Sequence, residues 1–156
     1  DAIRAALSSH SFLGIDRHGK VIIAETRGNK YGHLVMRGGS SGPNYTSEYV
    51  AFAEVLLRKA QIPNGIIIDC SHANSGSDYK RQIDVWEAML KHHQREGSPV
   101  VGMMLESNLF EGKQSIPSDL SQLRYGISIT DACIGWDETE RILVEANQRL
   151  TVNITC

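Results

Sequence analysis

Four residues whose side chains suit metal or anion chemistry stand at the ends of four apolar runs in this 156-residue sequence. They are Arg37, His72, Glu106 and Asp131. An imidazole and two carboxylates make a good ligand set for a divalent manganese, iron, cobalt or zinc ion. An arginine beside them would bind a phosphate or a carboxylate through two hydrogen bonds. If the runs are neighbouring parallel strands, their carboxyl ends aim all four side chains at one patch, which predicts a metal site beside an anion site.

Each of these residues also has a structural interpretation. His72 could be a structural histidine whose ring nitrogens form hydrogen bonds within the protein, and Asp131 could cap a helix or a turn. Glu106 is costly in an apolar strand unless it is paired. Arg37 could form a buried ion pair with Asp69, which would account for both residues. Residues of these types stand at the same place, the end of an apolar run, in all four cases. That coincidence favours the functional interpretation.

The cysteines and the remaining histidines are weaker candidates. Cys133 lies two residues after Asp131, so in a continuing strand the two side chains share a face and the thiol lies close to the metal. A small buried hydrophobe is the alternative for Cys133. Cys70 is expected to pack in the core, and His92 and His93, late on a charged helix, are expected at the surface.

The elements that must position these residues follow from the hydrophobic pattern. Continuous apolar runs suit strands buried on both faces, as in parallel sheets, and they lie within residues 33–39, 65–72, 99–107 and 126–136. Apolar residues at helical spacing, with a capping signal before the last, predict helices over residues 46–60, 78–93 and about 137–150. Residues 11–26 are typical of a β-hairpin, and residues 107–125 of a long loop with at most one helical turn.

Four alternating strand–helix units predict βαβ crossovers and an α/β fold with a parallel sheet. A doubly wound sheet is one candidate, but no glycine fingerprint follows the first strand. The other candidate is part of a (β/α)8 TIM barrel, which usually takes roughly 250 residues. With four strands, this chain would form about half of such a barrel.

Composition excludes several classes of protein. The formal charge of −2 with interspersed acids and bases argues against a nucleic-acid surface and against disorder. No run approaches the roughly 18 apolar residues of a membrane span. Three scattered cysteines fit a reducing cytoplasm better than a disulfide scaffold. The sequence opens on a helix-like heptad with no preceding cap, so we expect a segment of a longer chain.

Four motifs carry a resemblance to a known family. They are Arg37-Gly-Gly with Pro43-Asn-Tyr, Ile68-Asp-Cys-Ser-His-Ala-Asn-Ser, Leu105-Glu-Ser-Asn-Leu-Phe-Glu-Gly and Ser128-Ile-Thr-Asp-Ala-Cys-Ile-Gly-Trp. They resemble the microbial type I 3-deoxy-D-arabino-heptulosonate 7-phosphate (DAHP) synthases, and the last two motifs are highly specific. The resemblance runs to about residue 150 and implies that residues 1–156 form the C-terminal half of a TIM barrel. It places a regulatory hairpin at residues 11–26 and four strand–helix units within residues 33–150, and we recognise no counterpart for residues 151–156.

The resemblance also implies an activity. Members of the family are metal-dependent cytoplasmic homo-oligomers that condense phosphoenolpyruvate with D-erythrose 4-phosphate in the first step of the shikimate pathway. The matching positions are His72, Glu106 and Asp131 as metal ligands and Arg37 on phosphoenolpyruvate. Asp69 and Cys133 are not among the matched positions, and we expect them near the metal because they stand close to these ligands in the sequence. The family's fourth ligand, a cysteine, and most of its substrate-binding cations precede residue 1. The segment alone is therefore expected to need the upstream half of the barrel and to be inactive without it.

The hairpin resembles the ribbon through which the family binds an aromatic amino acid as a feedback inhibitor. Phe12, Gly14 and Ala24 fall on that site, and a glycine at position 14 accompanies the tyrosine-sensitive forms. Two rival hypotheses remain. One is a related sugar-phosphate synthase that uses another aldose phosphate, and the other is a catalytically inactive half-barrel that serves as a metal-binding, ligand-binding or assembly module.

Overall fold

The computed structural model describes residues 1–62 and 65–151 and contains four α-helices and five strands in that part of the chain. The helices are α1 (Ala2–Leu7), α2 (Ser47–Lys59), α3 (Gln82–His93) and α4 (Trp136–Thr151). The strands are β1 (Ser11–Ile15), β2 (Val21–Glu25), β3 (Leu34–Met36), β4 (Ile66–Asp69) and β5 (Val100–Met104). Short 3-10 turns occupy η1 (His72–Asn74), η2 (Tyr79–Arg81) and η3 (Leu120–Gln122). The predicted hairpin, the first three strands, the three helices and the single turn in the long loop are all confirmed.

A parallel sheet of order β3-β4-β5 forms the centre of the fold. Leu34 lies opposite Ile66, and Ile66 lies opposite Val100, so the amino ends of the three strands start level with one another. Their carboxyl ends therefore also meet at one edge of the sheet. An irregularity after Ile66 shifts the register of β5 by one residue.

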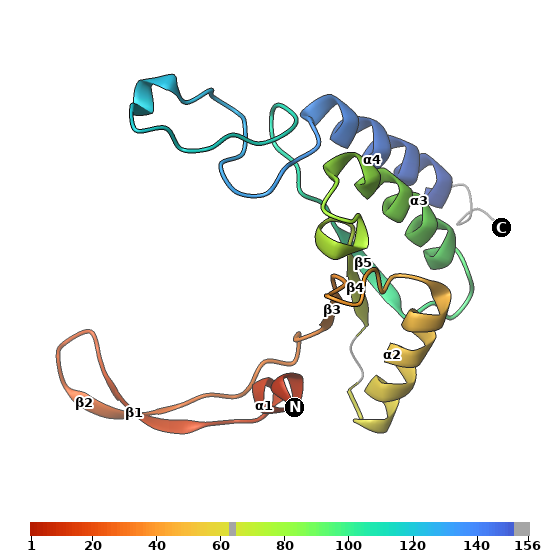
Figure 1. Ribbon diagram of the computed structural model, residues 1–156. Helices are drawn as coiled ribbons and strands as arrows, with labels where there is room; N and C mark the ends of the chain where they lie inside the picture. The colour runs from red at the N-terminus through yellow and green to blue at the C-terminus, as the bar shows by residue number, and fades with distance from the viewer. Residues whose placement is uncertain (63–64, 152–156) are drawn as a thin grey trace.

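Helices cover only one face of this sheet. Figure 1 shows α2, α3 and α4 on the same side of β3, β4 and β5. Ile66 and Ile68 point to that side and are completely buried, whereas Val35 and Val101 on the opposite face are 39% and 62% exposed. The prediction of strands buried on both faces is wrong, because no second helical layer lies against this face in the described part of the chain. Helices on one side are typical of a barrel wall and not of a doubly wound sheet.

The core lies between the sheet and the three long helices. Its completely or almost completely buried members include Val50 of α2, Val85 and Leu90 of α3, and Ile142 of α4. These residues recur at helical spacing, so each helix presents one apolar stripe to the strands. That packing fixes the ends of β4 and β5. Two of the candidate site residues, His72 and Glu106, come shortly after these ends in the chain.

The fourth predicted strand is not present. Residues 126–134 instead exchange backbone hydrogen bonds with residues 106–114: the amide of Phe110 donates to the carbonyl of Gly126, and Cys133 and Gly112 donate to each other's carbonyls. Isolated parallel bridges join Ser107 to Ile134 and Lys113 to Ser128 beyond β5. The apolar run does not form a regular ladder with β5, because the long loop after β5 folds back and takes its backbone hydrogen bonds.

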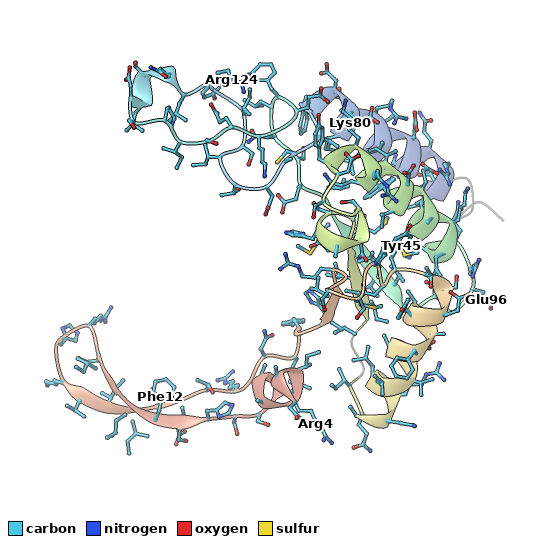
Figure 2. The ribbon with its side chains drawn as sticks, viewed as in Figure 1. Arg4, Phe12, Tyr45, Lys80, Glu96 and Arg124 are labelled. Atoms are coloured by element: carbon cyan, nitrogen blue, oxygen red, sulfur yellow. The ribbon has the colours of Figure 1, made fainter. Side chains whose placement is uncertain are left out.

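Two segments extend from the body of the molecule. The antiparallel β1–β2 hairpin forms an arm on which Phe12 lies, and the loop that carries Arg124 extends from the opposite end of the molecule towards the same side of the view (Figures 1 and 2). The accessible surface is 10874 Å², against roughly 7,800 Å² for a compact protein of this mass. Within the described residues, none of the helices combines the length and the hydropathy that a bilayer crossing requires. Residues 152–156, most of the segment that the sequence analysis could not match, lie outside the described part.

Candidate metal centre

His72 lies three residues beyond the end of β4, at the start of η1. Its φ of +51° is in the left-handed region, which non-glycine residues rarely adopt and which is enriched at functional sites. Its Nδ1 is buried and lies 2.8 Å from Oδ2 of buried Asp69, although the contact is too poorly aligned to be a good hydrogen bond. The carboxylate favours the tautomer with the proton on Nδ1, which leaves Nε2 with a free lone pair.

Glu106 lies two residues beyond the end of β5, and its side chain is about one third exposed. Its backbone is held on both sides, by the side chain of Gln82 and by the amide of Ile134. Because the backbone is fixed, the carboxylate projects from a defined point at the edge of the sheet.

Asp131 belongs to the irregular segment that replaces the fourth strand, and its side chain is 59% exposed. Cys133, two residues on, is buried, and its thiol donates to the backbone carbonyl of Asp131 at 3.4 Å. Burial is the main reason that the pKa of the Cys133 thiol lies above its ordinary value. The strand that would have put the two side chains on one face is absent, and the burial of Cys133 favours its interpretation as a small buried group.

The structure brings His72, Glu106 and Asp131 together. Nε2 of His72 lies 3.4 Å from Oδ2 of Asp131 and 3.9 Å from Oε1 of Glu106, and one ligand atom from each residue falls within 4.8 Å of the others. Ligands about 2.1 Å from one ion are separated by roughly 3.0 to 3.5 Å at adjacent positions, so a small adjustment would place all three around one cation. The donor set of one imidazole and two carboxylates suits a divalent transition metal.

Arg37 follows β3 and is exposed. The alternative in which it forms a buried ion pair with Asp69 is wrong, because Asp69 faces His72 and its Oδ1 accepts from the amide of Ser71. Arg37 has no ion pair among the residues that the structure describes. Its guanidinium therefore remains available at the same edge of the sheet as the cluster.

Asn74 ties the end of β3 to the end of β4. Its buried amide nitrogen donates to the backbone carbonyls of Met36 and Asp69, and its Oδ1 accepts from the amide of Asn44. Asn44 in turn accepts from the amide of Gly38. Gly38 has a φ of +73°, and a Cβ there would lie 2.8 Å from the Cβ of Ala73, so only glycine fits beside the loop that holds His72.

The sequence analysis missed two buried amides, Asn74 and Gln82, that hold the site together. No periodicity marks either residue. For Asn74 the only available signal was its place in the motif from Ile68 to Ser75, and for Gln82 there was no signal beyond a polar residue at the start of a helix.

Phe12, Gly14 and Ala24 lie on one face of the hairpin. Phe12 is paired with Ala24, and a Cβ at Gly14 would lie 3.7 Å from the Cβ of Ala24 and 3.9 Å from the ring of Phe12. Gly14 therefore leaves a small gap beside an aromatic ring. Phe12 lies on the extended hairpin (Figure 2), whereas His72 and Glu106 follow β4 and β5 of the central sheet.

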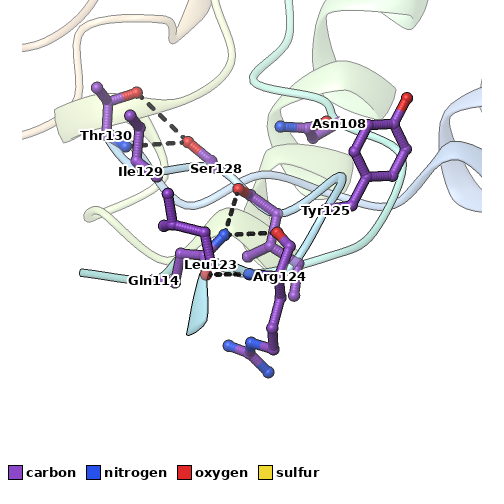
Figure 3. A pocket seen from close by; sticks show the side chains of 9 residues that line it. Asn108, Gln114, Leu123, Arg124, Tyr125, Ser128, Ile129 and Thr130 are labelled. Carbon is purple, nitrogen blue, oxygen red and sulfur yellow. Dashed lines mark hydrogen bonds between the residues drawn. The ribbon is translucent and has the colours of Figure 1, made fainter. Parts of the chain in front are cut away.

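A cavity of about 540 Å³ lies in the long loop, and none of the three candidate ligands lines it. Gln114 organises this loop: its amide nitrogen donates to the carbonyls of Arg124 and Ile127, and its Oε1 accepts from the amide of Arg124 (Figure 3). The cavity is wide open and contains exposed Arg124 and Tyr125 on its wall. The convergent metal-ligating groups lie at His72, Glu106 and Asp131 and not in this cavity.

Comparisons with known proteins find matches over almost the whole chain. The model of a family described as the DAHP synthetase I family matches residues 1–144. The chain is 40% identical over 155 residues to "Phospho-2-dehydro-3-deoxyheptonate aldolase, Tyr-sensitive" of Escherichia coli (strain K12), and 43% identical over 150 residues to the protein of that name from Enterobacter agglomerans. These matches cover 99% and 96% of this chain, and 43% and 70% of the two relatives.

A solved structure gives the same result for the fold. The structure of phospho-2-dehydro-3-deoxyheptonate aldolase from Francisella tularensis SCHU S4 aligns with a TM-score of 0.86 at 37% identity, over 97% of this chain and 43% of that chain. The chain thus spans less than half the length of the E. coli and F. tularensis relatives.

Proposed function

Because the chain belongs to the DAHP synthetase I family, we propose that it supplies the metal-binding half of an enzyme that condenses phosphoenolpyruvate with D-erythrose 4-phosphate to DAHP and phosphate. The observation that carries the proposal is the convergence of His72, Glu106 and Asp131 within 4.8 Å at the carboxyl edge of a parallel sheet. That edge is where barrel enzymes place their active sites.

The three residues would hold a divalent manganese, iron, cobalt or zinc ion, with Asp69 orienting the ring of His72. The bound ion would supply Lewis-acid polarisation of the aldehyde. Arg37 would bind the anionic groups of phosphoenolpyruvate with two hydrogen bonds and fix the orientation of its reacting carbon. Cys133 is a neighbour of the site whose buried thiol packs against the backbone of the segment that carries Asp131.

The fold supports half of a (β/α)8 barrel. Helices lie on one side of the sheet, and the bare face that holds Val35 and Val101 would become the barrel interior. The accessible surface exceeds that of a compact protein of equal mass by about 3,000 Å², which leaves room for an upstream half to cover part of it. The resemblance puts a fourth metal ligand and most of the substrate-binding cations in the upstream half, so we propose that this segment has no synthase activity alone.

The effector site is proposed on the hairpin, at Phe12, Gly14 and Ala24. Several relatives carry "Tyr-sensitive" or "Trp-sensitive" in their names, which supports an aromatic amino acid as the effector. The glycine at position 14, which accompanies the tyrosine-sensitive forms of the family, supports tyrosine as that amino acid. The outer face of the hairpin is apolar and exposed at Leu13 and Ile23, which supports a homo-oligomer for the complete enzyme.

A chimera tests the proposed function. This chain replaces the matched 155 residues of the E. coli Tyr-sensitive relative, and product is measured with manganese and both substrates. We expect DAHP formation, its loss in Glu106→Gln, and inhibition by tyrosine that shifts towards phenylalanine in Gly14→Ser. A folded, metal-binding chimera without turnover would support the inactive assembly module, and turnover with a different aldose phosphate would support the rival synthase. The isolated chain is the control and should give no product.

A further inference from the structure

The side chain of Gln82 is completely buried, and both of its hydrogen bonds go to the backbone of Glu106. Its amide nitrogen donates to the backbone carbonyl of Glu106 at 3.1 Å, and its Oε1 accepts from the backbone amide of Glu106 at 2.8 Å. A buried amide is costly unless it is hydrogen-bonded, so an apolar residue would be the ordinary choice where a helix packs on a sheet. The two bonds to Glu106 account for a glutamine at this position.

The backbone of Glu106 needs these bonds because the strand ladder has already ended. The last ladder bond between β4 and β5 runs from the amide of Cys70 to the carbonyl of Met104. Two residues further on, the amide of Glu106 has no strand to pair with, and the Gln82 side chain takes the place of one. On the other side, the amide of Ile134 donates to the same Glu106 carbonyl at 3.0 Å.

These bonds connect the three segments that carry the candidate ligands. Gln82 is the first residue of α3, ten residues after His72, and Ile134 is three residues after Asp131. We propose that Gln82 is a positioning residue that fixes the backbone of Glu106 and thereby sets the distances among the three metal ligands. This inference rests on the proposed function of the cluster and adds a residue that contacts neither the metal nor a substrate.

Gln82→Met provides the test, since methionine keeps the length and approximate volume of glutamine and removes both hydrogen bonds. Val85→Ala is the matched control: it lies on the same helix, is equally buried and would destabilise α3 without touching Glu106. Gln82→Glu is a second variant that keeps an acceptor for the Glu106 amide. Each chain is titrated with Co²⁺ while the ligand-field absorption spectrum, the dissociation constant and the amide hydrogen exchange of Glu106 are recorded.

We expect Gln82→Met to bind Co²⁺ about ten-fold or more weakly, with an altered ligand-field spectrum and faster exchange of the Glu106 amide. Gln82→Glu should fall between it and the wild type, and Val85→Ala should keep the wild-type spectrum and an affinity within about three-fold. Equal affinities and spectra for Gln82→Met and Val85→Ala would overturn the inference and leave the proposed metal site intact. Absence of Co²⁺ binding by the wild-type chain would instead overturn the metal site, and the inference with it.

Discussion

Nδ1 of His72 lies 2.8 Å from Oδ2 of Asp69, and this contact determines which nitrogen of the ring faces the cluster. The carboxylate is buried, so a lone pair on Nδ1 would be repelled and a proton on Nδ1 is favoured. Nε2 then points to Glu106 and Asp131 with its lone pair free. In the proposed metal site, Asp69 would therefore act on a bound ion through the orientation and tautomer of His72, without being a ligand.

Asp69→Asn tests this relationship. An asparagine can turn its amide nitrogen towards Nδ1, which would move the ring proton to Nε2 and block the ligand atom. We expect metal affinity to fall about 10- to 100-fold in a calorimetric titration with Mn²⁺. Asp84→Asn, at an exposed position of α3, removes a carboxylate elsewhere and should leave the affinity unchanged. Equal affinities for the two variants would contradict the role of Asp69.

Asn74→Ala is expected to destabilise the whole chain. The change leaves the carbonyls of Met36 and Asp69 and the amide of Asn44 without their partner in a buried place. Buried polar groups that lose a partner cost about 1–3 kcal/mol each, so we expect a loss of about 3 kcal/mol in urea unfolding. Asn147→Ala, on the exposed face of α4, is the control and should change the free energy of unfolding by less than about 0.5 kcal/mol.

The elements that could be predicted are those in which the apolar residues of the sequence pattern are the residues that the fold buries. The runs at β4 and β5 and the apolar stripes of α2 and α3 have this property, so periodicity locates them within a few residues. The run from Gly126 looks equally apolar, but its backbone is paired with the preceding loop. Which segment takes those hydrogen bonds depends on residues 106–114, and no local pattern contains that information.

The residues of the candidate site also fall into those that the sequence pattern could predict and those that it could not. His72, Glu106 and Asp131 were expected together because parallel strand ends meet at one edge, and the structure places them together even though Asp131 follows no strand. Gln82 could not be predicted, because its role depends on a three-dimensional contact with one backbone unit. His92 was expected in solvent, yet it is buried where the turn before β5 brings Ser98 against it.

The two faces of the sheet should respond differently to truncation. Ile68→Ala removes a completely buried side chain under the helices and should cost about 2–5 kcal/mol in urea unfolding. Val101→Ala, on the bare face, should change the stability of the isolated chain by less than about 0.5 kcal/mol. A cost near 2 kcal/mol for Val101→Ala would mean that another chain or another copy covers this face in solution. In the chimera with the upstream half, the same change should become costly.

His92 should make the chain less stable in mild acid. Burial, together with the positive charge of Arg95, lowers the pKa of His92, while a backbone hydrogen bond and the charge of Glu54 oppose that shift only in part. The folded state keeps the ring neutral against Ser98, whereas the unfolded chain takes up a proton as the pH falls below about 6.5. The unfolded state then binds more protons, so stability is present at neutral pH and is lost as the pH falls through that value towards the folded pKa.

In His92→Asn, which keeps a partner for Ser98 but cannot titrate, the loss of stability between about pH 7.5 and pH 5 should be smaller than in the wild type. Urea unfolding at the two pH values measures the difference, and Lys91→Gln, which changes the charge of α3 but keeps His92, should retain the wild-type loss. An equal loss in His92→Asn and the wild type would assign the acid sensitivity to other groups.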